Sequence, residues 1–308
     1  MSVNAEIKEL ATEQRNRKSM EIDRKETSEI LQIINEEDAL VAQAVKEQLS
    51  DIEEAVEAAY QAIKGGGRIF YAGAGTSGRI GIMDAVECPP TFSITPERVQ
   101  AVMAGGGNAF LKAVEGAEDD ETQGMDDLKR CGLTSKDMVI GIAASGRTPY
   151  VKGALKYARN IGAATSSLTN NKNSILSDYA EINIEVLTGP EVLTGSTRMK
   201  AATAQKMVLN MISSAVMIKS GKVYENLMVD LHVSNEKLKE RAVSIVQTVT
   251  DASYDTSLRV LEESRYQVKN AIVRIKTNAS YDEAERMLTQ AGGFVRKALE
   301  SHSNEQKQ

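Results

Sequence analysis

The chain has 308 residues, a formal net charge of −6 and 42% hydrophobic residues. This composition is typical of a soluble globular protein with one large or two modest domains, and the negative charge argues against a nucleic-acid partner. No apolar run is long enough for a membrane span, and the first residues lack the basic segment and the apolar segment of a signal peptide. Two cysteines, Cys88 and Cys131, and two histidines, His232 and His302, form no paired metal motif. We therefore expect a cytoplasmic protein with no metal, no cofactor and no membrane contact.

Apolar side chains recur at helical spacing over residues 27–64, and three glycines at 65–67 stop that pattern. Short apolar runs then alternate with segments of helix length, and we read these runs as strands at 69–71, 99–103, 138–142, 163–168 and 182–187. Beyond residue 234 the pattern is helical, with breaks near Asp251, Ser264, Asn278 and Gly292–Gly293. The prediction is an α/β fold: a three-layer parallel sheet of about five strands. Its predicted parts are N-terminal helices (1–48), a sheet domain (49–232) and a small C-terminal helical bundle (233–308).

The first predicted strand leads into YAGAGTSGRIGIMDAVECPP, residues 71–90, in which Gly73, Gly75 and Gly78 form the G-x-G-x-x-G pattern of dinucleotide sites. A dinucleotide site has a carboxylate at the end of the second strand, where it binds the ribose. Here that strand ends in alanine and three glycines. The hydroxyls of Thr76 and Ser77, beside a helix N-terminus, suit the several acceptor oxygens of a phosphate monoester instead.

The third predicted strand leads into a similar turn, Ala144-Ser145-Gly146-Arg147-Thr148. Both turns carry Ser-Gly-Arg, and both follow strands that end at the same edge of a parallel sheet. Small residues are common in tight turns, so one such turn alone is weak support. The pair predicts a phosphate cradle closed from its second side by Ser145 and Thr148.

The third notable stretch is GPEVLTGSTRMKAATAQK, residues 189–206, which we expect to open a helix running to Gly221. Ser196 or Thr197 is the expected N-cap of that helix. Arg198 and Lys200 could attract an anionic group of the ligand or join two subunits, and Glu191 is open to the same two interpretations.

The chain has a predicted strand, a Gly-x-Gly-x-Ser turn, a helix, and then a strand with a Ser-rich turn. This order of elements resembles the sugar isomerase (SIS) domain, which binds phosphorylated sugars. Five stretches resemble the N-acetylmuramic acid 6-phosphate etherases within that superfamily: YAGAGTSGRIGIMDAVECPPTF, AVEGAEDD, GIAASGRTPYV, GPEVLTGSTRMK and TEQRNRKSMEID. The resemblance runs from about residue 12 to the end and weakens after residue 250. The family pattern has glycine where Ala202 and Glu225 stand and serine where Val86 stands.

This resemblance implies removal of the D-lactyl ether from an amino-sugar phosphate, by elimination and hydration, in amino-sugar catabolism and peptidoglycan recycling. It implies Glu87 as proton donor and Glu115 as second acid/base residue, although a lone glutamate is usually a solvated surface residue. From the sequence we expect Glu87 to end a short helix, because Pro89 and Pro90 follow it. The substrate-binding residues expected are Gly75, Thr76, Ser77, Ser145, Gly146, Arg147, Thr148, Glu191, Ser196, Thr197 and Arg198.

Two other functions stay open at this point. An aldose–ketose isomerase on the same fold would also use a carboxylate at C2 of the sugar. A non-catalytic sugar-phosphate sensor, like the glucokinase regulatory protein, shares these motifs but carries two sugar-binding domains. Because the family's sheet domains pair, the resemblance also implies a homodimer.

Overall fold

The computed structural model describes residues 10–112, 114–231, 233 and 235–305. The chain packs as two compact units. Among the described residues, the sheet unit comprises residues 10–86 and Pro96–Ser213, and the helical unit comprises Glu87–Thr95 and residues 214–305. The domain boundaries expected after residues 48 and 232 stay a prediction. In the ranges that the structure describes, no helix is both long and apolar enough to cross a bilayer.

The sheet unit is built on five parallel strands in the order β2-β1-β3-β4-β5. Their bounds are β1 (Ile69–Gly73), β2 (Val99–Met103), β3 (Met138–Ala143), β4 (Ala164–Thr169) and β5 (Ile182–Glu185). Every residue of β1 and β3 is buried, as expected for central strands covered on both faces. The predicted fold class is therefore confirmed, including the number of strands.

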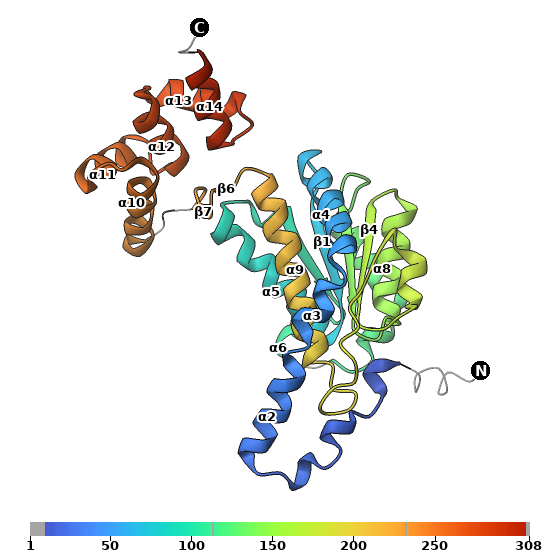
Figure 1. Cartoon of the computed structure of the whole chain (residues 1–308). Coiled ribbons are helices and arrows are strands. Elements are labelled where there is room, and N and C mark those ends of the chain that lie inside the picture. Colours follow the sequence, from blue (N-terminus) through green and yellow to red (C-terminus); the bar gives the residue numbers. More distant parts are fainter. Residues whose placement is uncertain (1–9, 113, 232, 234, 306–308) are drawn as a thin grey trace. The chain divides into compact units, whose positions relative to one another are not determined.

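Helices cover the two faces of this sheet (Figure 1). Helices α7 (Glu121–Arg130) and α8 (Pro149–Asn160) pack on the face that carries Phe70 and Ala72. Helix α5 (Gly75–Phe92) lies on the other face, where Gly81 approaches Tyr71 so closely that a Cβ at residue 81 would stand 2.9 Å from the Tyr71 Cβ. Since α5 and α7–α8 occupy opposite faces, the unit has three layers.

The N-terminal region of the sheet unit is helical, as predicted. Short 3₁₀ turns at Ala11–Glu13, Arg17–Ser19 and Ile22–Arg24 precede α2 (Thr27–Asp38), α3 (Val41–Lys46) and α4 (Leu49–Lys64). Helix α4 ends at Gly65, the first of the three glycines. The short α6 (Asn108–Leu111) follows β2, and α9 (Lys200–Lys219) follows β5.

The helical unit holds the hairpin β6 (Val223–Tyr224) and β7 (Leu227–Met228) and five helices within its described residues. These are α10 (Glu236–Thr250), α11 (Tyr254–Glu263), α12 (Val268–Thr277), α13 (Tyr281–Gln290) and α14 (Val295–Glu305). They end close to the predicted breaks, and Asp251 and Asn278 are left-handed C-caps. Glu225, in the hairpin turn, has φ +54. The family's glycine would adopt that backbone angle without strain.

Candidate active site

The turn from β1 into α5 is tight enough to need its glycines. A Cβ on Gly73 would lie 2.7 Å from the backbone nitrogen of Gly78, so any larger residue would push the turn apart. Gly75 begins α5 and is exposed, while Ser77, within the first turn of the helix, is only 8% exposed. Thr76 and Ser77 therefore lie in the first turn of α5, whose backbone N–H groups have no partner within the helix, and this is a favourable setting for an anion.

The turn from β3 into α8 lies beside the first turn. β1 and β3 are paired neighbours, with Gly73 opposite Ile142, so both turns leave the same edge of the sheet at the same level. Ser145 accepts a hydrogen bond from the backbone N–H of Arg147 (3.3 Å), and Thr148 is the N-cap residue of α8. The structure thus brings together the two turns that are predicted to bind the phosphate.

Glu115 shares a cavity with the first of these turns. The cavity has a volume of about 210 Å³, and Gly75, Arg79 and Glu115 are among its lining residues. Glu115 is exposed to solvent. The structure therefore places this carboxylate next to the first of the two turns for which a phosphate is predicted.

Arg79 is a residue of the site that sequence reasoning does not assign. Its guanidinium donates to the backbone oxygens of Ala109 (2.8 Å) and Phe110 (2.9 Å), so it fixes α6, which precedes the Glu115 segment, against the start of α5. The signal is present in the repeated Ser-Gly-Arg, but an interpretation based on the hydroxyls leaves the arginine out.

Glu87 does not end a short helix, and that expectation is wrong. Helix α5 continues through Pro89 and Pro90 to Phe92. Cys88 and Phe92, four residues apart, are both buried, so packing on one helix face outweighs the two backbone hydrogen bonds that the prolines cannot donate. Glu87 is exposed. At 1.5 Å per residue it lies about 18 Å along the helix axis from Gly75.

The third motif is arranged differently from the expectation. Helix α9 begins at Lys200, so neither Ser196 nor Thr197 is its N-cap. Glu191 supplies the cap instead: its buried carboxylate accepts the backbone N–H groups of Lys200 and Ala201, both at 2.9 Å. Burial raises the pKa of Glu191, although these two bonds oppose the shift. The expected binding role of Glu191 stays a prediction, and in this structure its carboxylate sets the position of the helix.

Arg198 and Lys200 of the third motif have opposite surroundings. Arg198 is exposed, as an anion-binding side chain requires. Lys200 is 1% exposed, and its ammonium lies 2.6 Å from the Glu37 carboxylate. Lys200 is therefore not available to a ligand carboxylate, whereas Arg198, in the loop before α9, lies at the surface. Ser196 and Thr197 are half-buried beside it.

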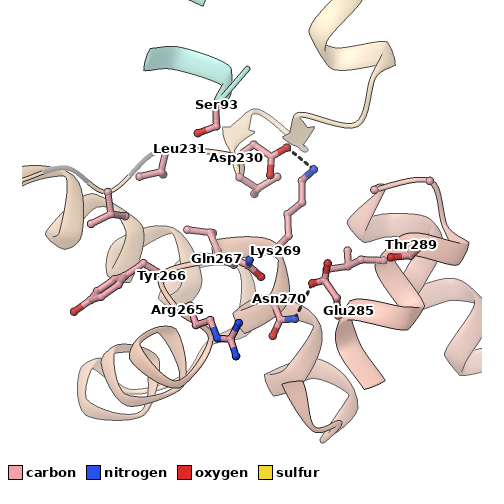
Figure 2. A pocket seen from close by; sticks show the side chains of 16 residues that line it. Ser93, Asp230, Leu231, Arg265, Tyr266, Gln267, Lys269, Asn270, Glu285 and Thr289 are labelled. Atoms are coloured by element: carbon pink, nitrogen blue, oxygen red, sulfur yellow. Dashed lines mark hydrogen bonds and ion pairs between the residues drawn. The ribbon is translucent and has the colours of Figure 1, made fainter. Parts of the chain in front are cut away.

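A further cavity, of about 670 Å³, lies in the helical unit (Figure 2). Its polar groups hold one another: Lys269 donates to Asp230 (2.6 Å), and the Asn270 amide donates to Glu285 (3.3 Å). Burial lowers the pKa of Lys269, against the effect of Asp230. Because the ammonium of Lys269 is already paired with Asp230, we consider this cavity a poorer candidate for a phosphate than the edge of the sheet. Among the described residues, no three His, Cys, Asp or Glu side chains are grouped to hold a metal ion.

Comparison with known proteins identifies relatives of this chain. Three family models match: the glucokinase regulatory protein N-terminal SIS domain over residues 51–159, the SIS domain over 114–215, and the C-terminal lid domain of glucokinase regulatory protein over 225–285. A solved structure of a candidate phosphosugar isomerase involved in capsule formation from Bacteroides fragilis has a TM-score of 0.50 and 20% identity. It covers 66% of this chain and 98% of its own, and shows the fold alone.

Curated relatives are far more similar in sequence. The N-acetylmuramic acid 6-phosphate etherase of Bacillus subtilis is 57% identical over 98% of this chain and 99% of its own length. The enzyme of that name from Geobacillus sp. WCH70 is 56% identical over 96% of this chain and all of its own. At this identity and coverage, the chain belongs to the N-acetylmuramic acid 6-phosphate etherase family.

Proposed function

We propose that this protein cleaves the D-lactyl ether of N-acetylmuramic acid 6-phosphate, giving N-acetylglucosamine 6-phosphate and D-lactate. It would thus be a cytoplasmic carbon–oxygen lyase of amino-sugar catabolism and peptidoglycan recycling. The observation that carries the proposal is the 57% sequence identity to an etherase over 98% of this chain. The geometry supports it, because two hydroxyl-bearing turns and the exposed Glu115 lie at one edge of the sheet.

The phosphate is assigned to the two neighbouring turns. In the β1–α5 turn, Thr76 and Ser77 would donate from hydroxyl groups, together with N–H groups of the first turn of α5. In the β3–α8 turn, Ser145 and Thr148 would donate from the other side. Gly75, Gly146 and Arg147 complete the cradle that we expect. Binding energy from the phosphate then orients the sugar carbons for reaction.

The reaction that these groups suit is an elimination. In the open-chain sugar, the C1 aldehyde acidifies the hydrogen at C2, so a carboxylate base can remove that proton. The C3–oxygen bond then breaks, its electron pair leaves with lactate, and an acid protonates the departing oxygen. Addition of water to the unsaturated aldehyde, with OH going to C3 and H to C2, gives the product. We assign the base to Glu115, which lines the cavity next to Gly75, and the acid to Glu87.

The position of Glu87 leads us to infer a shared site in a homodimer. A hexose 6-phosphate is much shorter than the roughly 18 Å that separate Gly75 from Glu87 along α5. A phosphate held at the start of α5 therefore places the C3 oxygen out of reach of the same helix's Glu87. Met83 (41% exposed) and Val86 (59% exposed) leave an apolar surface next to Glu87, which suits contact with a second copy of α5. We propose that Glu87 of the partner subunit completes each site.

The alternatives make different predictions for one assay. Purified protein is incubated with N-acetylmuramic acid 6-phosphate, and D-lactate and sugar products are measured over time. The proposed function predicts equal amounts of lactate and N-acetylglucosamine 6-phosphate, and loss of both in Glu115→Gln. An isomerase would interconvert aldose and ketose without lactate. A sensor, the class named by two of the family models, would bind the sugar phosphate and release nothing.

A further inference from the structure

The N-terminal segment of the described chain, residues 10–38, makes a series of long-range contacts that the proposed chemistry does not use. We call this segment the strap. It contains three 3₁₀ turns and α2, and it lies beside the loop that leads into α9 (Figure 1). Its partners are more than 150 residues away in sequence.

The strap holds the third motif by hydrogen bonds to backbone oxygens. The Ser19 hydroxyl donates to the Val192 carbonyl at 2.7 Å, and the Asn16 amide donates to the Pro190 carbonyl at 3.2 Å. Ser19 and Asn16 are both buried. The segment 188–199 contains neither helix nor strand, so its conformation depends on contacts of this kind.

A buried ion pair adds to these bonds. Glu37, at 4% exposure, accepts from Lys200 (2.6 Å) and Asn16 (2.8 Å) and also pairs with Lys18 (3.0 Å). Removing two charges from water costs about as much as their attraction returns, so a buried pair is weak support for a role in stability. What it does provide is a defined geometry, because an unpaired charge here would be expensive. The pair thereby fixes the start of α9, two residues after Arg198.

The strap also reaches the second phosphate-binding turn. Thr12 is fully buried and accepts a hydrogen bond from the Asn171 amide at 3.0 Å. The same amide donates to the carbonyl of Ala144 at 2.9 Å, next to Ser145. One segment therefore supports two of the three loops to which we assign the substrate.

We propose that the strap is a positioning device for the substrate site, in which Ser19, Glu37 and Thr12 set the loops that bind the sugar phosphate. This inference rests on the proposed function, since that function assigns the loops to substrate. Ser19 contacts the backbone of Val192, Glu37 contacts the Lys200 ammonium, and Thr12 contacts the Asn171 amide. These residues therefore act through the loops that carry Arg198 and Ser145. Loss of a strap contact should therefore weaken substrate binding more than it slows the bound substrate's reaction.

The test compares strap variants with matched controls at the opposite edge of the sheet or within a strand. Ser19→Ala is matched by Ser167→Ala, which removes another buried serine hydroxyl, one that donates to Asn183 at 2.8 Å. Glu37→Gln is matched by Asp137→Asn, another buried carboxylate, which binds Arg68 before β1 and so lies at the amino ends of the strands. Each variant is measured for KM and kcat in lactate release and for calorimetric affinity toward N-acetylglucosamine 6-phosphate, well below its Tm.

The proposal expects Ser19→Ala to raise KM and Kd about fivefold, which corresponds to one lost hydrogen bond, and Glu37→Gln to raise them about tenfold or more. Changes in kcat should stay within about threefold, and the control variants should lower Tm without raising KM. Amide hydrogen exchange in residues 188–199 should speed up in the strap variants only. Equal changes in KM for strap variants and controls would overturn the proposal. If Glu37→Gln fails to fold, Ser19→Ala alone decides, and an unchanged rate of amide hydrogen exchange in residues 188–199 of that variant would overturn the proposal.

The proposed function can fail separately. If the wild-type protein binds N-acetylglucosamine 6-phosphate but releases no lactate, the etherase assignment is wrong. The comparison of the variants' affinities for this sugar phosphate then still tests whether the strap positions the site. If the wild-type protein binds no sugar phosphate, both fall. The hydrogen-exchange comparison needs no ligand, and it shows whether the strap orders the 188–199 segment in either case.

Discussion

The hydroxyl of Tyr71 on β1 donates to the carboxylate of Asp84 on α5 at 2.8 Å, in the middle of the sheet unit. Asp84 is 4% exposed and also accepts from Asn210 (2.6 Å) and Ser213 (3.1 Å) of α9. One carboxylate thus joins a strand and two helices. Because α5 begins at the predicted phosphate turn, these bonds also hold that helix against β1 and α9.

The first prediction concerns this junction. Asp84→Asn replaces an acceptor oxygen by an NH₂ group that faces donors, and should lower the free energy of unfolding by about 1–3 kcal/mol. Asp126→Asn, which removes half-exposed Asp126 from its surface pair with Lys129, should stay within about 0.5 kcal/mol. Urea unfolding of both variants measures the difference. Equal stability of the two would show that the Asp84 bonds contribute little.

The second prediction concerns the phosphate. Ser77→Ala should weaken binding of N-acetylglucosamine 6-phosphate by about 1–3 kcal/mol, because a hydrogen bond to a charged group is lost. Titration calorimetry at constant ionic strength measures this loss. Turnover of unphosphorylated N-acetylmuramic acid as fast as the 6-phosphate would contradict the assignment of the two turns.

The third prediction separates a shared site from a site within one chain. Glu87→Gln and Glu115→Gln should each be nearly inactive, since general acid–base catalysis is worth about a hundred- to ten-thousandfold. If each site takes Glu115 from one subunit and Glu87 from the other, a mixed dimer of the two variants has one intact site. Unfolding and refolding an equal mixture should then restore about a quarter of wild-type lactate release. A mixture as inactive as its components would place both residues in one chain.

The fourth prediction follows from two buried carboxylates. Burial alone would raise the pKa of Glu37, but hydrogen bonds from Lys200, Lys18 and Asn16 outweigh it and hold the pKa below its usual value of 4.5. For Asp137, hydrogen bonds from Arg68 and Thr134 likewise outweigh burial and lower the pKa from 3.8. An acid whose pKa is lower in the folded state stabilises the protein above its unfolded pKa. That contribution disappears as the pH falls through the folded pKa.

The free energy of unfolding should therefore be nearly constant from about pH 7 to 5 and decrease steeply below about pH 4.5. Denaturant unfolding at several pH values measures this dependence. Asp137→Asn should flatten the acid limb, because it removes one of the groups whose proton uptake drives it. Glu54→Gln, at an exposed position of α4, serves as the control. An equal flattening by both variants would contradict the role of the buried carboxylates.

The strands and both phosphate-binding turns can be predicted from sequence because their signals are local. Apolar runs, glycines and hydroxyls stand next to one another in the chain, and the sheet then brings the turn at Gly75 beside the turn at Ser145. The continuation of α5 through Pro89 cannot be predicted in this way, because it depends on the buried packing of Cys88 and Phe92. There a tertiary contact outweighs a local rule.

The charged residues are harder to predict for a related reason. A surface position is the natural expectation for Lys200 because lysines are seldom buried, yet its partner Glu37 lies 163 residues earlier. Asp84 and Arg79 likewise form hydrogen bonds with partners far away in sequence, namely the Asn210 amide and the backbone oxygen of Ala109. A single sequence shows which residues could pair, but the distance between them exists only in the fold.

The central claim, an elimination that breaks the sugar's C3–oxygen bond, is tested most directly by isotope tracing. The protein is incubated with N-acetylmuramic acid 6-phosphate in water enriched in oxygen-18, and both products are analysed by mass spectrometry. The mechanism assigned to Glu115 and Glu87 predicts one oxygen-18 atom at C3 of N-acetylglucosamine 6-phosphate and unlabelled lactate. Label in the lactate, with an unlabelled C3 hydroxyl, would mean that water attacks the lactyl side, and the elimination mechanism would be wrong.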